Sequence, residues 1–154
     1  MEVERIKILF RFYSDILEQE AVETMWAIPI DVNKKYYKLD SIPFYPNSIA
    51  SDDVVFAEYD EDEGMLTYRS TVEYSGNSTI AVVTMLDTIN INDIREKFKN
   101  LGCISEKASD CFFTMEVPAT LNYRLIKERL DELENLNFIE YSEPCLSNIH
   151  NKQI

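Results

Sequence analysis

The side chains best suited to catalysis are few and widely spaced. The chain contains one histidine, His150, and three cysteines, Cys103, Cys111 and Cys145. Ser-His-Asp and Cys-His mechanisms require an imidazole that is held rigidly between a nucleophile and an orienting group. His150 lies in the C-terminal segment SNIHNKQI, residues 147–154, which we expect to be loosely ordered. We therefore predict no catalytic residue and no enzymatic activity, although 28 acidic residues leave accidental glycosidase-like carboxylate pairs open.

The spacing of potential ligands indicates no metal or cofactor site. The cysteines and the histidine are separated by seven, 33 and four residues, without the Cys-x-x-Cys pairs of a structural zinc site. In an EF-hand loop that began at Asp60, glycine would fall at position five instead of six, and Thr71 would replace the glutamate at position twelve. The three glycines of the chain are too far apart to form a phosphate-binding loop. We predict that the protein binds neither a metal nor a cofactor.

The densest group of ionisable side chains is the acidic run in YDEDEGMLTY, residues 59–68. Four carboxylates are consecutive here: Asp60, Glu61, Asp62 and Glu63. The flanking runs VVFAEY and MLTYRSTVEY read as strands, which places the acidic run at the tip of a hairpin. Because like charges repel, we expect this tip to stabilise nothing locally. Such a tip either meets a cationic partner or is a solvated turn that only aids solubility.

The charge of the whole chain restricts its partners. The sequence has 28 acidic and 15 basic residues, for a net charge of −13. The segment from Met1 to Ser75 has 16 acidic and 7 basic residues, or −9, so the excess lies mainly in the first half. Nucleic acids and anionic membrane surfaces require Lys and Arg, so we expect neither as a partner. The charge fits a basic protein partner or simple solubility.

The sequence also indicates a compartment. The N-terminal residues MEVERIKILFRF carry charges where a signal peptide would have an apolar run. No stretch approaches the roughly 18 apolar residues of a membrane span. An odd number of cysteines lacks the dense spacing of a secreted disulfide framework. We expect a cytoplasmic protein with reduced thiols.

Residues 1–77 are predicted to form an antiparallel β module. Period-two alternation indicates strands in RIKILFRFY, AVETMWAIPI, YYKLDSI, VVFAEY and MLTYRSTVEY. Five residues of the second run share one face: Val22, Thr24, Trp26, Ile28 and Ile30. Pro29 restricts the end of this strand to a sheet edge or a bulge. We expect a strongly curved sheet or a small barrel.

Residues 78–146 are predicted to form a ferredoxin-like β-α-β-β-α-β unit. Strands are indicated in STIAVVTM, CISEKAS, CFFTMEV and FIEYSE, and helices in NDIREKFKNL and from about Leu121 to Asn135. We expect Asn92 to cap the first helix and Gly102 to end it in a left-handed conformation. The predicted apolar stripes are Ile94, Phe98 and Leu101 in the first helix, and Leu121, Leu125, Ile126, Leu130 and Leu133 in the second. The predicted fold class is α+β, with the tail at residues 147–154.

Several short motifs occur together in a familiar order: VETMWAIPI, YYKLDSIPFYP, DDVVFAEYD, SGNSTIAVV, LGC and YSEPCL. With these motifs the chain resembles an uncharacterised bacterial domain family, over about Arg5 to Leu146. That family offers no catalytic residues to transfer. The resemblance implies a setting, because such small acidic bacterial domains are similar to the immunity proteins of polymorphic and contact-dependent growth inhibition toxins.

This setting leads to an expected function. We expect a non-enzymatic immunity protein that binds and neutralises a cognate basic toxin domain through an acidic surface, because complementary charge accelerates such association. The expected partner-binding residues are Glu58, Tyr59, Asp60, Glu61, Asp62, Glu63 and Tyr68. The alternative is a small-molecule-sensing or regulatory module that uses the ferredoxin-like half. The sequence indicates no oligomeric state.

Overall fold

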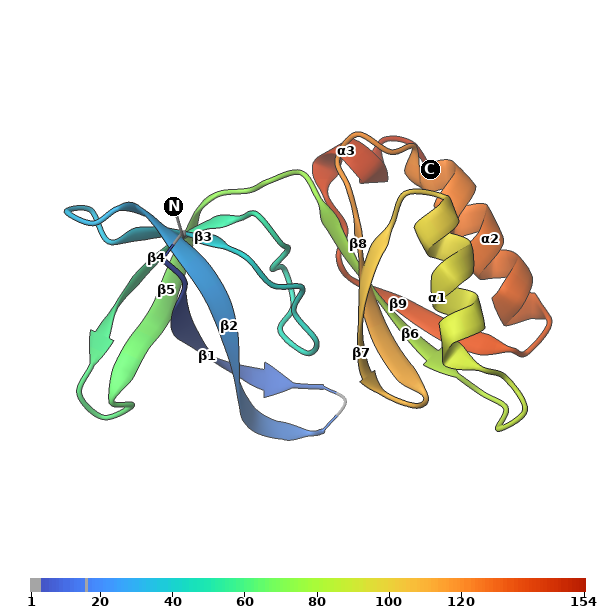
Figure 1. The fold of residues 1–154 in the computed structure, drawn as a ribbon, viewed down its shortest axis with the longest axis horizontal. Coiled ribbons are helices and arrows are strands. Elements are labelled where there is room, and N and C mark those ends of the chain that lie inside the picture. The colour runs from blue at the N-terminus through green and yellow to red at the C-terminus, as the bar shows by residue number, and fades with distance from the viewer. Residues whose placement is uncertain (1–3, 16) are drawn as a thin grey trace. The chain divides into compact units, whose positions relative to one another are not determined.

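The protein is a mixed α/β chain with two sheets of mostly antiparallel strands and three short helices (Figure 1). The structure is a computed structural model that describes residues 4–15 and 17–154. The chain divides into two compact units, a first unit from Met1 to Ser75 and a second unit from Gly76 to Ile154. None of the helices in the described ranges is long and apolar enough to cross a membrane.

The elements have the following bounds. The first unit contains β1 (Ile6–Ser14), β2 (Gln19–Asp31), β3 (Tyr36–Leu39), β4 (Val54–Asp60) and β5 (Met65–Glu73). The second unit contains β6 (Ser78–Thr84), α1 (Ile91–Asn100), β7 (Ile104–Ser109), β8 (Phe112–Val117), α2 (Tyr123–Asn135), β9 (Ile139–Cys145) and α3 (Asn148–Asn151).

The first unit is a closed barrel in the strand order β1-β2-β3-β4-β5. Successive strands are antiparallel, and a parallel pairing of Leu9 with Thr67 joins β1 to β5 and closes the barrel. Of the two arrangements expected from the sequence, a strongly curved sheet or a small barrel, the structure has the barrel. A register shift follows Pro29 in the β2–β3 pairing, so this proline lies at a bulge, where its missing N–H is tolerated.

The apolar face of β2 that the sequence singled out is the outer face of the barrel. Met25 and Ala27 point inward and are buried, whereas Val22, Trp26 and Ile30 are among the exposed large hydrophobic residues. A barrel of five strands has a narrow interior that side chains must fill, and Met and Ala fit such a space better than Trp. The alternation of the strand thus leaves a row of apolar side chains on the outside.

Two carboxylates, of half-buried Glu23 and buried Asp53, anchor the long connection between β3 and β4. The carboxylate of Glu23 accepts hydrogen bonds from the backbone N–H groups of Phe44 and Tyr45, at 2.9 and 3.2 Å. Asp53 accepts from the N–H groups of Ala50 and Ser75, at 3.1 and 2.8 Å. Because loop N–H groups have no strand partner, these carboxylates supply the acceptors that the loop needs.

The second unit is a four-stranded antiparallel sheet in the order β7-β8-β6-β9. Helices α1 and α2 both pack on this sheet, and their buried residues share one apolar core with residues of β6, β8 and β9 (Figure 1). That core consists of Ile80, Val82, Ile91, Ile94, Phe98, Cys103, Phe113, Met115, Val117, Tyr123, Ile126, Leu130 and Ile139. Both amphipathic helices thus cover a common apolar surface.

The ends and faces of the helices differ from the expectations in detail. The side chain of Asn90, not Asn92, caps α1, and it accepts a hydrogen bond from the N–H of Asn92 at 2.9 Å. The helix therefore begins at Ile91, two residues before the start that a cap at Asn92 would give. Gly102 follows α1 with φ +106°, a conformation that favours glycine and that we expected at this position.

The predicted apolar stripe of α2 was wrong at one position. Leu125 is exposed, whereas Tyr123 is fully buried and lies on the core face with Ile126 and Leu130. Helix α2 begins at Tyr123, and residues three and then four positions further along, Ile126 and Leu130, lie on the same face of the helix. Leu125 does not fall on this face.

The C-terminal tail is folded, contrary to the expectation of a loosely ordered segment. Residues Asn148–Asn151 form α3, capped by the side chain of Ser147, and His150 is fully buried. The side chain of Gln153 accepts a hydrogen bond from the N–H of Tyr123 at 2.7 Å. The tail is short and polar, but its hydrogen bonds to the rest of the second unit hold it in place.

Candidate partner-binding hairpin

The expected acidic hairpin is formed by β4 and β5. Glu58 pairs with Thr67, Tyr59 with Leu66, and Asp60 with Met65. The turn closes with a hydrogen bond of 2.8 Å from the N–H of Gly64 to the carbonyl of Asp60. Gly64 has φ +72°, which explains why glycine ends the acidic run.

Asp60 organises the turn. One oxygen of its carboxylate accepts hydrogen bonds from the backbone N–H groups of Asp62 and Glu63, at 2.9 and 3.1 Å. The other oxygen accepts from Nη2 of Arg69 at 2.9 Å. The hydrogen bond from Arg69, with those from the turn, lowers the pKa of Asp60 below its ordinary value. The expectation that the acidic tip stabilises nothing locally was therefore wrong.

Two further carboxylates of the hairpin are paired with arginines. Glu58 accepts a hydrogen bond from Nε of Arg69 at 3.1 Å. Glu63 accepts from Nε and Nη2 of Arg11 on β1, at 2.8 and 2.7 Å. Sequence reasoning missed both arginines as members of the site. No local pattern links Arg11 to Glu63, because their contact depends on closure of the barrel between β1 and β5.

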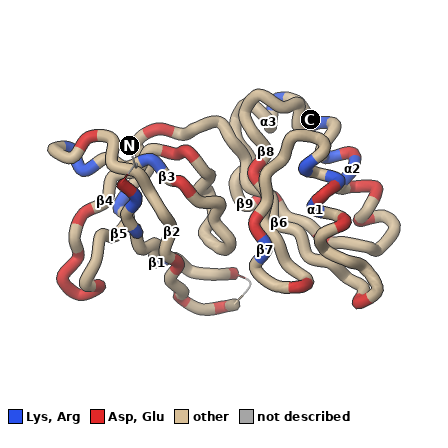
Figure 2. Tube along the Cα trace, viewed as in Figure 1, with Lys and Arg blue, Asp and Glu red and all other residues tan. Residues whose placement is uncertain are grey.

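Glu61 and Asp62 are exposed, and the acidic run colours the end of the β4–β5 hairpin red (Figure 2). Within residues 4–15 and 17–154, their carboxylates have no hydrogen-bond or ion-pair partner. Tyr59 is also exposed, at 62% of its full accessible area. These three side chains are the part of the expected site that is open to a partner.

Tyr68 occupies a different environment from the other expected site residues. Its ring stacks on that of Phe10, with 4.6 Å between ring centroids. Its hydroxyl group is 2.8 Å from Oγ1 of Thr71, within hydrogen-bond distance. Tyr68 is half-buried and packs against the barrel core, so its first role is to support the hairpin.

A pair of side chains whose types could do chemistry is buried in the second unit. Oγ of Ser78 and Nδ1 of His150 are 2.6 Å apart, and Nε2 of His150 is 3.0 Å from the carbonyl oxygen of Pro118. Since a carbonyl only accepts, Nε2 carries the proton and Nδ1 accepts from the serine hydroxyl. Ser78 and His150 have no exposed area, so this nucleophile–base pair has no path to a substrate. It fastens the C-terminal segment to the sheet.

A polar network joins α2 to β9. Lys127 donates to the hydroxyl of Tyr141 at 3.0 Å, that hydroxyl donates to Asp131, and the hydroxyl of Tyr123 donates to Glu143 at 2.6 Å. Burial and the hydrogen bond to Asp131 raise the pKa of Tyr141 to about 12. A phenol with a raised pKa is a poor general base at neutral pH, so this network stabilises the packing of α2. No group of three His, Cys, Asp or Glu side chains in the described part of the chain is arranged to hold a metal ion.

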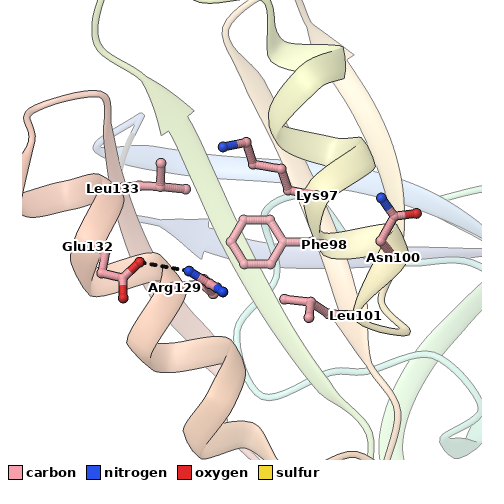
Figure 3. Close-up of a pocket in the computed structure, with 7 residues that line it drawn as sticks. All are labelled: Lys97, Phe98, Asn100, Leu101, Arg129, Glu132 and Leu133. Carbon is pink, nitrogen blue, oxygen red and sulfur yellow. Dashed lines mark hydrogen bonds and ion pairs between the residues drawn. The ribbon is translucent and has the colours of Figure 1, made fainter.

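A groove lies between the C-terminal turn of α1 and α2 (Figure 3). Its volume is about 360 Å³. It is lined by Lys97, Phe98, Asn100, Leu101, Arg129, Glu132 and Leu133. Apolar side chains face the space between the helices, and the one ion pair among the residues drawn joins Arg129 to Glu132 at 3.1 Å. The groove therefore has an apolar floor and a polar rim.

Comparison with known proteins identifies the family. One family model matches residues 23–141, which include most of β2, all of β3 to β8 with α1 and α2, and the acidic hairpin. The chain belongs to that family, described as Domain of unknown function (DUF4265). The resemblance to an uncharacterised domain family is thus confirmed, while the link to immunity proteins remains a prediction.

The fold of this DUF4265 chain also occurs in a solved structure. It is similar to the structure described as the novel crystal structure of a hypothetical protein from Neisseria gonorrhoeae, with a TM-score of 0.78 and 23% sequence identity. The match covers 96% of this chain and 99% of the other. A search of curated proteins found no match. At 23% sequence identity, this similarity shows that the two proteins share a fold and nothing more.

Proposed function

We propose that the protein is a non-enzymatic, cytoplasmic immunity protein that binds and neutralises a cognate basic toxin domain through its acidic hairpin. One observation carries the proposal. The exposed carboxylates of Glu61 and Asp62 are presented on a turn whose backbone is fixed by Asp60, which is itself held by Arg69. Two charges are thus directed to solvent from a rigid support, beside the exposed ring of Tyr59.

This arrangement suits a cationic protein partner for physical reasons. A fixed turn loses little conformational entropy when it binds, so more of the contact energy contributes to affinity. Unpaired carboxylates at a hairpin end extend the negative field of the first unit, which has a net charge of −9, and this field attracts a basic groove. Tyr59 adds contact area with few rotatable bonds.

The second unit is proposed to be ferredoxin-like. Its elements follow the order β-α-β-β-α-β, and its sheet places the first and third strands, β6 and β8, side by side at the centre. In this proposal, the barrel of the first unit carries the toxin-binding hairpin.

The test starts from the genome. The gene beside that of this protein is expected to encode a toxin, and deletion of the present gene is expected to be lethal only while that toxin is active. The purified protein is expected to bind the toxin domain in a stable complex that abolishes its activity. A toxin-bearing strain that loses the gene without a growth defect would contradict the proposal.

The groove between α1 and α2 favours a second candidate, a small-molecule-sensing or regulatory module. It offers an apolar floor, with Phe98 almost fully buried, and the ammonium of Lys97 at its rim (Figure 3). A sensing module is expected to show ligand-dependent thermal stabilisation with small metabolites and to have no toxin gene beside it. An immunity protein is expected to show the reverse.

A further inference from the structure

A row of four apolar side chains and one threonine runs along the outer face of β2. We call it the β2 stripe, and its members are Val22, Thr24, Trp26, Ile28 and Ile30. Val22 is 50%, Trp26 39% and Ile30 54% exposed, while Thr24 is exposed and Ile28 is half-buried. At about 3.3 Å per residue the stripe extends over roughly 26 Å. Single exposed hydrophobic residues are ordinary, but a row of this length with one threonine in it is typical of an interaction surface.

Trp26 at the centre of the stripe is held in place before any partner binds. The guanidinium of Arg5 lies 4.8 Å and the ammonium of Lys7 lies 5.0 Å from the centre of its ring. The backbone N–H of Trp26 donates to Oγ of Ser41 at 3.0 Å, and its carbonyl accepts from the N–H of Asp40 at 2.8 Å. Such fixed tryptophans are the residues on which binding energy concentrates in protein interfaces.

The β2 stripe is continuous with the acidic hairpin. Val22, at one end of the stripe, pairs with Arg11 across the β1–β2 ladder. Arg11 in turn binds the carboxylate of Glu63 in the hairpin turn. Apolar stripe and acidic turn therefore adjoin on the barrel surface, with one arginine between them. Within Met1–Ser75, this combination has the composition of a protein interface, with an apolar centre and a charged rim.

We infer that the β2 stripe is the apolar centre of the surface whose charged edge is the acidic hairpin. This inference rests on the proposed function and specifies the partner further. The occupant is the surface of the cognate toxin domain, with an apolar patch placed against Trp26 and basic side chains placed against Glu61 and Asp62. The carboxylates accelerate the encounter, and the stripe slows dissociation by burying apolar area.

The chain offers a built-in probe, because Trp26 is its only tryptophan. The wild-type protein is labelled with 5-fluorotryptophan, which gives a single ¹⁹F resonance, and is titrated with the toxin domain encoded by the neighbouring gene. The resonance is expected to shift and broaden as the complex forms. This measurement needs no substitution in the stripe, so it does not depend on a variant that fails to fold.

Substitutions provide the second readout. Trp26→Ala is expected to weaken toxin binding at least about tenfold, mainly through faster dissociation, and Ile30→Ser is expected to act in the same direction. Val72→Ala serves as the matched control, because Val72 is an exposed apolar residue at the end of β5 that lies away from the acidic turn. Its affinity for the toxin is expected to equal that of the wild type.

The outcomes separate the inference from the function on which it rests. A ¹⁹F shift together with weaker binding of Trp26→Ala supports both. Tight binding of the wild type with an unmoved resonance, and with Trp26→Ala as tight as the control, overturns the inference and leaves the proposed function standing. No binding of the wild type to the neighbouring toxin overturns the proposed function and, with it, the inference.

Discussion

Arg11 of β1 and Glu63 of the β4–β5 turn are joined by two contacts, Nε–Oε1 at 2.8 Å and Nη2–Oε1 at 2.7 Å. The two residues are 52 positions apart in the sequence, and the contact spans the closure of the barrel. It ties the acidic turn to the strand that borders the β2 stripe. The acidic run is thus a supported structure in which Asp60 and Glu63 have internal partners, while Glu61 and Asp62 face outward.

The first prediction concerns the internal role of Asp60. Asp60→Ala is expected to destabilise the hairpin, because it removes the acceptor of the N–H groups of Asp62 and Glu63 and the partner of Arg69. Glu61→Ala is expected to leave stability unchanged. Amide hydrogen exchange of Gly64 reports the difference, and equal protection in the two variants would contradict this role of Asp60.

The same carboxylate sets a pH dependence at acid pH. The pKa of Asp60 is lowered in the folded state, so the unfolded chain binds a proton at a higher pH than the folded chain does. Its stabilising contribution is therefore present above the ordinary pKa of aspartate and is lost as the pH falls through the lower, folded value. The difference in unfolding midpoint between wild type and Asp60→Ala is expected to shrink in that acidic range. A difference that stays constant would contradict the prediction.

The second prediction compares two tyrosines of the hairpin. Tyr68→Ala is expected to lower the free energy of unfolding by about 2 kcal/mol, because it removes the stack on Phe10 and leaves a gap against the core. Tyr59→Ala, at an exposed position, is expected to change it by less than about 0.5 kcal/mol. Urea unfolding measures both. A larger loss at Tyr59 than at Tyr68 would mean that the two roles are assigned wrongly.

The third prediction uses the single histidine. Burial lowers the pKa of His150 in the folded state, and its Nδ1 already accepts a hydrogen bond from Ser78. The unfolded chain therefore gains a proton near the ordinary histidine pKa while the folded chain resists it. The contribution of neutral His150 to the free energy of unfolding is expected to be fully present above about pH 6.5. It is expected to fall as the pH decreases toward the pKa of His150 in the folded protein.

The control for this prediction is His150→Gln, which removes the titrating group. Urea unfolding of both proteins is measured between about pH 5 and 8. The free energy of unfolding of the wild type is expected to fall relative to that of His150→Gln as the pH decreases. The raised pKa values of Glu23 and Asp53 act in the opposite sense, but they are common to both proteins and cancel in the difference. A pH-independent difference would contradict the role of His150.

The fourth prediction concerns the start of α1. Asn90→Ala is expected to cost about 1 kcal/mol, because the side chain of Asn90 caps the N–H of Asn92. Asn92→Ala removes only a surface hydrogen bond from Arg95 and is expected to cost less. Thermal unfolding of the two variants shows which substitution destabilises the protein more. A larger loss of stability for Asn92→Ala would assign the cap to Asn92.

Local patterns in the sequence predicted every strand and the two long helices but missed α3, and they did not predict the contacts between the elements. The alternation in residues 54–73 and the glycine after the acidic run predicted the hairpin, because turn chemistry and period-two alternation are local. The pairing of Glu63 with Arg11 depends on barrel closure, which no local pattern encodes. The outward direction of Trp26 depends on the space inside the barrel. The sequence predicted a loosely ordered tail around His150, because its partners, Ser78 and Pro118, are distant in the sequence.

The central claim is that Glu61 and Asp62 attract a basic toxin. The direct test is stopped-flow association of the purified protein with the toxin domain encoded by the neighbouring gene. The double variant Glu61→Gln/Asp62→Asn is compared with Asp87→Asn/Glu96→Gln, which removes the same charge from exposed positions of the second unit.

The hairpin variant is expected to associate about threefold more slowly or worse at 0.01 M salt, where the screening length is about 30 Å, and to approach the wild type at 0.1 M, where it is about 10 Å. The control variant is expected to associate at nearly the wild-type rate in both conditions. Equal association rates for all three proteins at low salt would contradict the claim that the acidic hairpin guides the toxin to this protein.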